Sequence, residues 1–598
     1  MSCYPGLYTF ASFKAIDLEW IGPENSCSAQ RKSRSTQKSG GRMHLNFTND
    51  QNMEKTSGLV ESLKKPVPGS LLLLFLLVCV GIGLQMSGNH FDWSGYLMMS
   101  FFYGMMFYVA LKAGESVKED SHISELILAG RSLPIGIALF SMAATWVGGG
   151  FINGTAESVA SYGLAWTQAP WGYALSLVIG GLFFAGKMRS HRFTTLLDPI
   201  EDRFGAKLSA LFYLPALMGE VFWTGAILTA LGTTSGALLG LDFNVSIILS
   251  ALITIAYTAL GGMKAVAKTD VLQLGILLLG LWFTIPFVLP EGMGLSELYQ
   301  AYRDKMGALG DPFPPLTGWE HPDWGSSWFQ WWDYCLLLIF GGIPWHVYFQ
   351  RVLSSQSAKV AKWLSIGAGC FCLMAAFPAL IIGMTGAVTD WAASGLPAPT
   401  ESSVILPWVL KYKTPFYVAT IGLGALAAAV MSSADSSVLS ASSLGAWNVY
   451  RPFFLKGKPS HKVSLMVKKL IWIIGISAML IALKVKSVYA LWFLCSDFVY
   501  CILFPQLVLS LYDPKANRIG SFCGFLVAVT LRFGGGEPVL GIPTFIQYPL
   551  MNADGVIHFP FRTFAMISSL LTIVIVSRLT QSISPSTPLK IRSENHES

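Results

Sequence analysis

Apolar runs of about 20 residues recur along most of the chain and restrict it to very few folds. Residues 271–289 and 363–384 are two of these runs. A bilayer core of about 30 Å needs an α-helix of this length, and backbone that faces lipid must be hydrogen-bonded within its own segment. Of the 598 residues, 53% are hydrophobic and only 13% are charged, about half the charge of a soluble protein. We therefore expect an all-α polytopic membrane protein.

The apolar runs predict about 13 membrane-spanning helices. A shorter run at residues 70–85 is an optional extra helix, and the residues before it have a composition typical of disorder. The predicted spans are residues 92–111, 132–154, 163–186, 207–238, 244–262, 270–290, 328–348, 363–386, 416–447, 470–484, 488–511, 517–532 and 561–579.

Lys and Arg are concentrated in alternate loops. The positive-inside rule places these loops and the C-terminal tail in the cytoplasm, and the loops around 291–326 and 533–560 outside. The net charge of +7 therefore indicates orientation rather than nucleic-acid binding. Asn244, in Asn-Val-Ser on a predicted outside turn, is the candidate glycosylation site. The cytoplasmic set contains Lys187, Arg189, Arg192, Arg203, Lys207, Lys264, Lys268, Arg351, Lys359, Lys362, Arg451, Lys456, Lys458, Lys462, Lys468 and Lys469.

Glycine interrupts two of the spans. Gly148 to Gly150 form a Gly-Gly-Gly run, and Gly341, Gly342 and Pro344 interrupt a later span. Non-helical backbone at membrane depth is tolerated where it lines a protein cavity. Five spans lead from the first break to the second, so the broken helices enter the membrane from opposite sides. This pattern predicts an inverted repeat with the substrate site between its halves. Close helix packing through small residues is the alternative for each cluster.

A tryptophan lies beside each break: Trp146 at the first and Trp345 at the second. Trp166, Tyr173 and Trp223 lie on nearby segments, although a position at the lipid interface is an equal alternative for Trp166. Aromatic ring faces bind quaternary ammonium groups at up to about 2 kcal/mol per desolvated ring. Three or four rings approach the roughly 8 kcal/mol of a micromolar site. We interpret these residues as a box for an organic cation.

Hydroxyl groups form a second candidate site. Ser433, Ser436 and Ser437 lie on adjacent turns of one predicted span, facing the unwound carbonyls of Ala144 and Val147. Such oxygens suit sodium, a hard cation, although a serine-rich face is equally typical of helix packing.

Two carboxylates are candidates for ion binding. Asp435 lies inside a span, where an ionisable residue is by default a functional candidate. Asp270, at the start of a span, is either a ligand for a second ion or an ordinary acid at a helix N-terminus.

At these motifs the chain resembles the sodium/solute symporter family over about residues 90–580. Matching segments include Ala144-Thr-Trp-Val-Gly-Gly-Gly, Gly341-Gly-Ile-Pro-Trp and Gln350-Arg-Val-Leu-Ser-Ser. Its tryptophans are those that separate the family's choline carriers from its sugar carriers. The resemblance implies a LeuT-type 5+5 inverted repeat that couples inward sodium flow to choline uptake. It also implies chloride dependence and a supply of choline for acetylcholine synthesis.

Carried onto this sequence, the resemblance implies three sites. The choline site would be Trp146, Trp166, Tyr173, Trp223 and Trp345. One sodium site would be Ala144, Val147, Ser433, Ser436 and Ser437. A second sodium site would use Thr145 and Asp270, while direct ligation by Asp435 stays open.

The expected organisation follows from the repeats. Choline, sodium, chloride and the lipid bilayer are the expected partners, with no nucleic acid, and a homo-oligomer is left open. We expect a multi-pass plasma-membrane protein, found by resemblance in presynaptic and synaptic-vesicle membranes. The segments are a disordered extension at 1–66, the optional helix at 67–90, a first helix and loop at 91–131, repeat 1 at 132–290, an extracellular loop at 291–327, repeat 2 at 328–511, C-terminal helices at 512–580 and a cytoplasmic tail at 581–598.

Three features depart from the family pattern: the long N-terminal extension, the short tail, and Phe151 where a tyrosine is expected. Two alternatives to choline import stay open. One is a sodium symporter for another quaternary ammonium or small organic solute, and the other is a non-transporting sensor or leak channel. An enzyme is not expected, because the spans hold no nucleophile with a plausible histidine partner.

Overall fold

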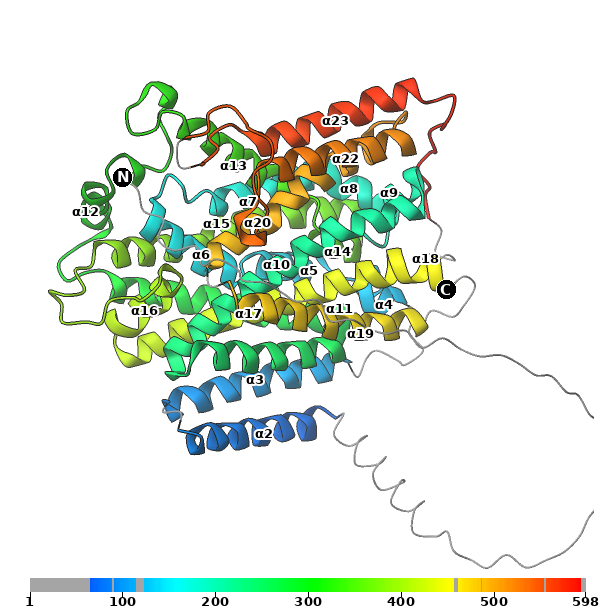
Figure 1. Cartoon of the computed structure of the whole chain (residues 1–598). Helices are drawn as coiled ribbons and strands as arrows, with labels where there is room; N and C mark the ends of the chain where they lie inside the picture. The colour runs from blue at the N-terminus through cyan, green and yellow to red at the C-terminus, as the bar shows by residue number, and fades with distance from the viewer. Residues whose placement is uncertain are drawn as a thin grey trace, which may run out of the picture. The chain divides into compact units, whose positions relative to one another are not determined.

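The computed structural model describes residues 65–88, 91–114, 123–455, 461–485, 487–552 and 555–592. Nearly all of the expected extension at 1–66 lies outside these ranges, as do Lys456, Lys458 and the last six residues of the tail. The described residues belong to one unit, Leu59–Ser598. They form helices joined by loops and, within these ranges, only isolated β-bridges instead of strands. Figure 1 shows most of the long helices running along a common direction.

The first half of the described chain contains the optional extra helix, the first broken helix and the long helices that follow it. These are α2 (Pro66–Met86), α3 (Trp93–Gly114), α4 (Ile123–Leu128), η1 (Ala129–Arg131), α5 (Ile135–Trp146), α6 (Gly149–Tyr162), α7 (Ala169–Ile179), η2 (Gly180–Ala185), α8 (Gly186–Ser190), α9 (Asp198–Phe204), α10 (Ala206–Leu239), α11 (Phe243–Val288) and α12 (Leu295–Met306).

The second half contains the second broken helix, the serine-rich helix and the C-terminal hairpin. These are η3 (Gly307–Gly310), η4 (Gly318–Glu320), α13 (Ser327–Gly341), α14 (His346–Ser354), α15 (Ala358–Val388), η5 (Ser402–Val404), α16 (Ile405–Lys413), α17 (Phe416–Leu444), η6 (Gly445–Tyr450), α18 (Arg451–Phe454), α19 (His461–Ala482), α20 (Val488–Phe498), η7 (Val499–Leu503), α21 (Phe504–Tyr512), α22 (Arg518–Gly534), η8 (Pro538–Leu540) and α23 (Phe561–Leu579).

The described residues contain 10 helical segments that are long and apolar enough to cross a membrane, or 11 when the bent pair α5 and α6 is counted as one span. The all-α polytopic fold is confirmed, whereas the number of 13 spans is not. Helix α22, for example, has 17 residues. The optional run forms helix α2, which packs on α3, where the Tyr96 hydroxyl donates to the Leu77 carbonyl at 2.7 Å.

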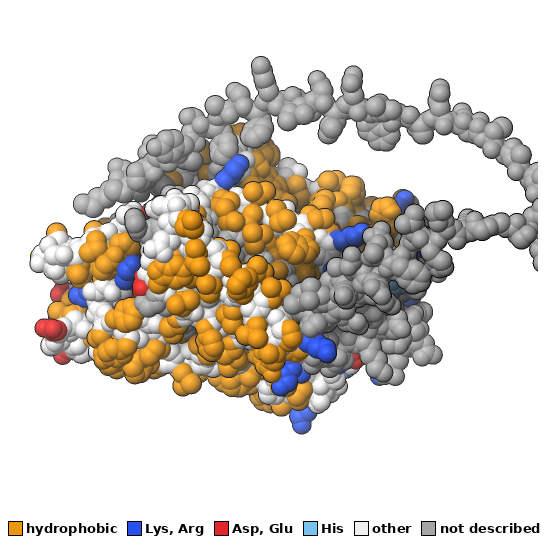
Figure 2. Space-filling view, turned by 90° about the horizontal axis from the view of Figure 1, so that it is seen from below, with side chains coloured by type: hydrophobic (Ala, Val, Ile, Leu, Met, Phe, Trp, Pro, Cys, Tyr) orange, Lys and Arg blue, Asp and Glu red, His pale blue; other side chains and the backbone are white. Residues whose placement is uncertain are grey.

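Exposed hydrophobic side chains cover much of the helical surface. Figure 2 shows one face, on which hydrophobic side chains fill the middle and many charged side chains lie towards the ends. On α2, Leu71, Phe75 and Leu76 are each at least half exposed. Apolar exposure on this scale is expected of a surface that faces lipid.

The first break lies between α5 and α6, which are bent by 45°. Helix α5 ends at Trp146, and Val147 and Gly148 leave the helical conformation. A Cβ atom on Gly148 would lie 1.9 Å from the Ser433 Oγ of α17. Glycine is therefore required for the unwound backbone to approach the serine-rich helix.

The second break separates α13, which ends at Gly341, from α14, which begins at His346. Trp345 has extended backbone at this junction, and Pro344 has no N–H to continue a helix. Both breaks therefore lie at the glycines that predicted them.

A loop expected at residues 263–269 is absent, because the two helices within α11 (Phe243–Val288) meet at Gly262 and the second runs on to Val288. Gly262 has a φ of 59°, which turns the chain without a separate loop. Lys264, whose charge indicated a loop, forms an ion pair with Glu125 of α4 at 2.6 Å. The predicted spans 244–262 and 270–290 are therefore two helices that meet at Gly262, and the second begins earlier than expected.

Helix α17 packs against α10 and α11, and α6 packs against α15. Every residue of α17 from Ala425 to Leu444 is buried, including its serines. The polar face of α17 is therefore directed at other helices, including the first broken helix, rather than at lipid.

Candidate functional site

A cavity of about 20 Å³ lies between the two breaks. Six side chains, from four helices and the second break, line it: Trp146, Tyr173, Trp223, Trp345, Trp492 and Cys495. The tryptophans at positions 146, 223 and 345 are each at most 7% exposed. Four of the five residues predicted for the aromatic box thus meet in one cavity.

The rings of this cavity meet mostly at steep angles. Trp146 lies 6.3 Å from Tyr173 at 88° and 6.1 Å from Trp223 at 58°, measured between ring centroids. Trp223 lies 5.4 Å from Trp345 at 70°. Trp345 also donates its indole N–H to the Gly341 carbonyl at 2.7 Å, which satisfies a carbonyl at the break. The breaks therefore position tryptophans from both repeats around one point.

Trp166 lies elsewhere. It stacks on Trp324 at 5.7 Å and meets Tyr334 at 6.1 Å, and its carbonyl accepts a hydrogen bond from Tyr489. The predicted choline contact of Trp166 is therefore not brought to the cavity of the other four residues.

Sequence reasoning missed Trp492 and Cys495, which α20 contributes. Trp492 lies 5.0 Å from Tyr173 and 5.8 Å from Phe151, the position where a tyrosine was expected. Neither residue adjoins a break, so no local signal set them apart from other apolar residues of their span. Two neighbours that both face the cavity become visible only once α20 is seen against α6 and α10.

The serine face divides into two parts. Ser433 donates to the Thr145 carbonyl at 2.8 Å, and Ser436 Oγ lies 3.2 Å from Thr145 Oγ1, so both reach the first break. Ser437 instead faces α10, where its hydroxyl lies 2.6 Å from Thr224 Oγ1. The structure therefore brings two of the three predicted serines to the unwound segment that contains Ala144 and Val147.

Asp270, the predicted acid of a second sodium site, has a basic partner. Its carboxylate lies 3.2 Å from Arg351 Nη2, and both side chains are fully buried. Ser141 and Ser432 each donate to this carboxylate at 2.5 Å. Arg351 also donates to Ser436. The sequence pattern placed Arg351 in a cytoplasmic loop, whereas in the structure it is buried in α14 next to Asp270.

Thr145 and Asp270 are linked through a shared neighbour. The Thr145 hydroxyl donates to the Ser141 carbonyl at 2.8 Å, while Ser141 Oγ donates to Asp270. Asp435 is fully buried and accepts a hydrogen bond from Ser436 at 3.3 Å. Ser433, Ser436 and Asp270 are therefore hydrogen-bonded to the last turns of α5 before the first break, and Asp435 is linked to them through Ser436.

Two further buried carboxylates were missed. Glu220 of α10 accepts hydrogen bonds from Ser440 at 2.6 Å and Ser437 at 3.1 Å. Glu157 of α6 accepts from Ser487 at 3.0 Å, among other donors. An acid inside a predicted span was the available signal for Glu220, which lies in the span 207–238, whereas Glu157 lies just after the predicted span 132–154. Asn244, the glycosylation candidate, is exposed at the start of α11.

Comparison with known proteins identifies the family of this chain. The sequence model described as "Sodium:solute symporter family" matches residues 126–528. This chain belongs to the sodium:solute symporter family. The chain is therefore a multi-pass, sodium-coupled transporter and not an enzyme.

Two relatives show how closely the chain follows one branch of the family. It is 44% identical over 506 residues to "High-affinity choline transporter 1" of Caenorhabditis elegans, covering 81% of this chain and 85% of that protein. It is 43% identical over 508 residues to "High affinity choline transporter 1" of Homo sapiens, covering 82% and 85%.

A solved structure shares the fold. The substrate-bound outward-open state of a Na+-coupled sialic acid symporter aligns with a TM-score of 0.66 at 20% sequence identity, covering 82% of this chain and 98% of that one. The LeuT-type fold implied by the family resemblance is confirmed.

Proposed function

We propose that this chain imports choline across the plasma membrane by sodium-coupled, chloride-dependent alternating access, and so supplies acetylcholine synthesis. The observation that supports the proposal most directly is the cavity formed by Trp146, Tyr173, Trp223, Trp345 and Trp492. The names of the relatives that match over most of the chain agree with it.

The cavity has the chemistry that a quaternary ammonium requires. Its lining offers ring faces and one thiol, and such a cation has no N–H with which to form a hydrogen bond. Each desolvated ring contributes up to about 2 kcal/mol, so four or five rings reach micromolar affinity without an ion-paired carboxylate. Because the cavity measures about 20 Å³, the rings must move apart to admit a substrate. The two broken helices are the elements that supply such movement in the proposal.

Sodium is proposed to bind where Ser433 and Ser436 approach the unwound backbone at Ala144 and Val147. Glycine at position 148 allows this approach. A second sodium at Thr145 and Asp270 would share Asp270 with Arg351, which is already paired with it. We therefore assign the first ion to the serine site and retain the second as the weaker proposal.

The orientation is proposed from charge. Lys187, Arg203 and Arg451 lie near helix ends in the Lys- and Arg-rich set of connections. The positive-inside rule assigns these connections to the cytoplasm. The C-terminal segment after α23 is then cytoplasmic, and Asn244 is outside. An inward positive charge gains about 2.3 kcal/mol per 100 mV, so both sodium and choline enter down the membrane potential.

The test is uptake of labelled choline by cells that express the full chain. We expect saturable uptake that requires sodium and falls when chloride is replaced by gluconate. Competition with betaine and carnitine separates choline from other methylammonium solutes. Equal and unsaturable uptake with and without sodium would overturn the proposal, and sodium current without accumulation would indicate a leak channel.

A further inference from the structure

The residues that follow α23 pack back onto the helices. Asn517, at the start of α22, donates to the Ser584 carbonyl at 2.8 Å, and Arg203 of α9 donates to the Thr587 carbonyl at 2.8 Å. Leu589 packs against the main hydrophobic core. We name residues 580–592 the C-terminal strap.

The strap ends at an ion pair with α9. Arg592 Nη1 lies 2.5 Å from Asp198 Oδ2, and Nη2 lies 3.2 Å from Asp202 Oδ1. The Arg592 amide donates to the His191 carbonyl at 3.2 Å, and its guanidinium lies 5.6 Å from the Phe193 ring. One residue of the strap therefore contacts both α9 and the loop between α8 and α9.

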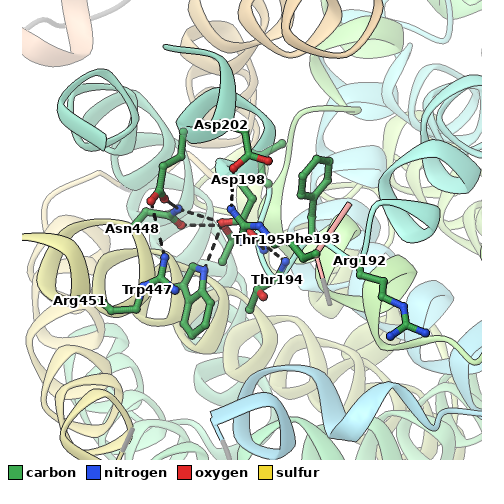
Figure 3. A network of polar contacts seen from close by, with 12 residues as sticks. Arg192, Phe193, Thr194, Thr195, Asp198, Asp202, Trp447, Asn448 and Arg451 are labelled. Atoms are coloured by element: carbon green, nitrogen blue, oxygen red, sulfur yellow. Dashed lines mark hydrogen bonds and ion pairs between the residues drawn. The ribbon is translucent and has the colours of Figure 1, made fainter. Parts of the chain in front are cut away.

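Asp198 connects this loop to the serine-rich helix (Figure 3). Its side chain is fully buried and accepts the amide N–H of Thr194 at 2.6 Å and of Thr195 at 3.1 Å. Its other oxygen accepts from Trp447 and Asn448, each at 3.2 Å. Trp447 and Asn448 lie in η6, which continues α17 directly.

The same loop reaches the second broken helix. The Leu196 amide donates to His346 Nδ1 at 3.3 Å, and His346 follows Trp345, which lines the aromatic cavity. Arg592 is therefore bonded to a buried carboxylate whose neighbours lead in one direction to α17 and in the other to α14.

We propose that the C-terminal strap is a clasp that holds the cytoplasmic side of the transport pathway closed, with Arg592 as its positioning residue. Opening on that side requires α14, η6 and the α8–α9 loop to move apart, and Asp198 and Asp202 hold the strap across this junction. In the described residues, the acids of α9 form ion pairs with Arg592 and with Arg451. Loss of Arg592 leaves these acids paired with Arg451 alone. The clasp therefore favours the state that is closed to the cytoplasm.

Cys495 provides the readout, because it is buried and lines the cavity. The full chain in inside-out membrane vesicles is treated with 2-(trimethylammonium)ethyl methanethiosulfonate, whose sulfenyl sulfur joins the thiolate while methanesulfinate leaves. Mass spectrometry of the Cys495 peptide gives the rate from the cytoplasmic side, and right-side-out vesicles give the rate from outside. Neither rate requires that choline be transported, so failure of the clasp and failure of choline uptake are distinguishable.

Arg592→Gln is expected to raise the cytoplasmic rate about fivefold, the lower end of coupling between linked sites, and to lower the outside rate. Lys590→Gln is the matched control, since it removes an exposed strap charge two residues away and should leave both rates unchanged. Asp202→Asn removes the charge of Arg592's partner on α9 and should shift both rates in the same direction as Arg592→Gln.

Combining Asp202→Asn with Arg592→Gln should add little to Arg592→Gln alone. Equal cytoplasmic rates in Arg592→Gln and the unaltered chain would overturn the proposal. If Arg592→Gln fails to reach the membrane, the Cys495 modification rates of Asp202→Asn replace it. A cytoplasmic rate equal to that of the unaltered chain would then overturn the proposal.

Discussion

The indole of Trp345 meets the ring of Trp223 edge to face, with their centroids 5.4 Å apart. Trp345 belongs to the second break and Trp223 to the middle of α10, so the contact joins the two repeats across the cavity. Movement of one repeat against the other must change this contact. The contact between Trp223 and Trp345 thus helps to form the proposed substrate box, and alternating access would break the same contact.

Replacing Trp345 with Ala should weaken choline binding by about 1 to 2 kcal/mol, which is roughly a fivefold to thirtyfold rise in Kd. Trp345→Phe should be milder, because it retains a ring face. The measurement is the concentration dependence of labelled-choline uptake, corrected for surface abundance. Trp166→Ala is the control, since Trp166 lies outside the cavity. An equal loss in Trp166→Ala and Trp345→Ala would contradict the assignment to the cavity.

The two halves of the serine face should respond differently. Ser433→Ala removes a hydroxyl at the first break, and we expect the sodium concentration for half-maximal uptake to rise several-fold before abundance changes. Ser437→Ala removes a hydroxyl that faces Glu220 and Thr224, and we expect little change in sodium dependence. The measurement is uptake against sodium concentration at saturating choline. A larger effect of Ser437→Ala would place the ion on the α10 side.

Sequence patterns predicted the fold because the features that define its helices and breaks are local in the sequence. Apolar length defines each span, and Gly148 and Gly342 mark positions where a side chain would collide with a neighbouring helix. The turn at Gly262 was missed, because two nearby lysines indicated a loop at residues 263–269, whereas one glycine at positive φ separates the two helices of α11.

The site was predicted only in part, because its remaining residues are defined by contacts between distant segments. Tryptophans beside a break are visible in sequence, whereas Trp492 gains its place only through the packing of α20 on α6 and α10. Asp270 was visible as an acid, but its partner Arg351 is 81 residues away. Ser436 and Ser437 are neighbours in sequence and lie on different sides of α17.

Arg351→Gln should strongly reduce stability. Removing one partner of a buried ion pair costs about 3 to 5 kcal/mol, because the other charge is left unpaired in the interior. Both Asp270 and Arg351 are fully buried, so solvent does not screen the loss. Asp270→Asn in the same chain should recover part of the stability, as measured by thermal unfolding of the detergent-purified protein. Strictly additive losses would show that the two side chains act independently.

The Asp198 pair should be insensitive to pH near neutrality. Burial alone would raise the pKa of Asp198, but Arg592, the Thr194 amide and Arg451 lower it below its ordinary value of about 4. A depressed pKa gives stabilisation that is present above pH about 4 and lost as pH falls through the folded pKa. The melting-temperature difference between the unaltered chain and Asp198→Asn should therefore stay constant from about pH 8 to 5 and shrink below about 4. A difference that already shrinks between pH 8 and 6 would mean that Asp198 titrates near neutrality.

Gly148→Ala tests whether close approach of the break to α17 is needed for ion coupling. The added Cβ would lie 1.9 Å from Ser433 Oγ, so the two segments must separate, and overpacking of this kind costs about 1 to 3 kcal/mol. Gly136→Ala, on the same broken helix, is the control, because nothing lies within 4 Å of its added Cβ. We expect Gly148→Ala to raise the sodium requirement of uptake and Gly136→Ala to leave it unchanged. If Gly148→Ala keeps normal sodium dependence, the unwound carbonyls are not the sodium ligands, because separating them from Ser433 would have weakened any ion held between them.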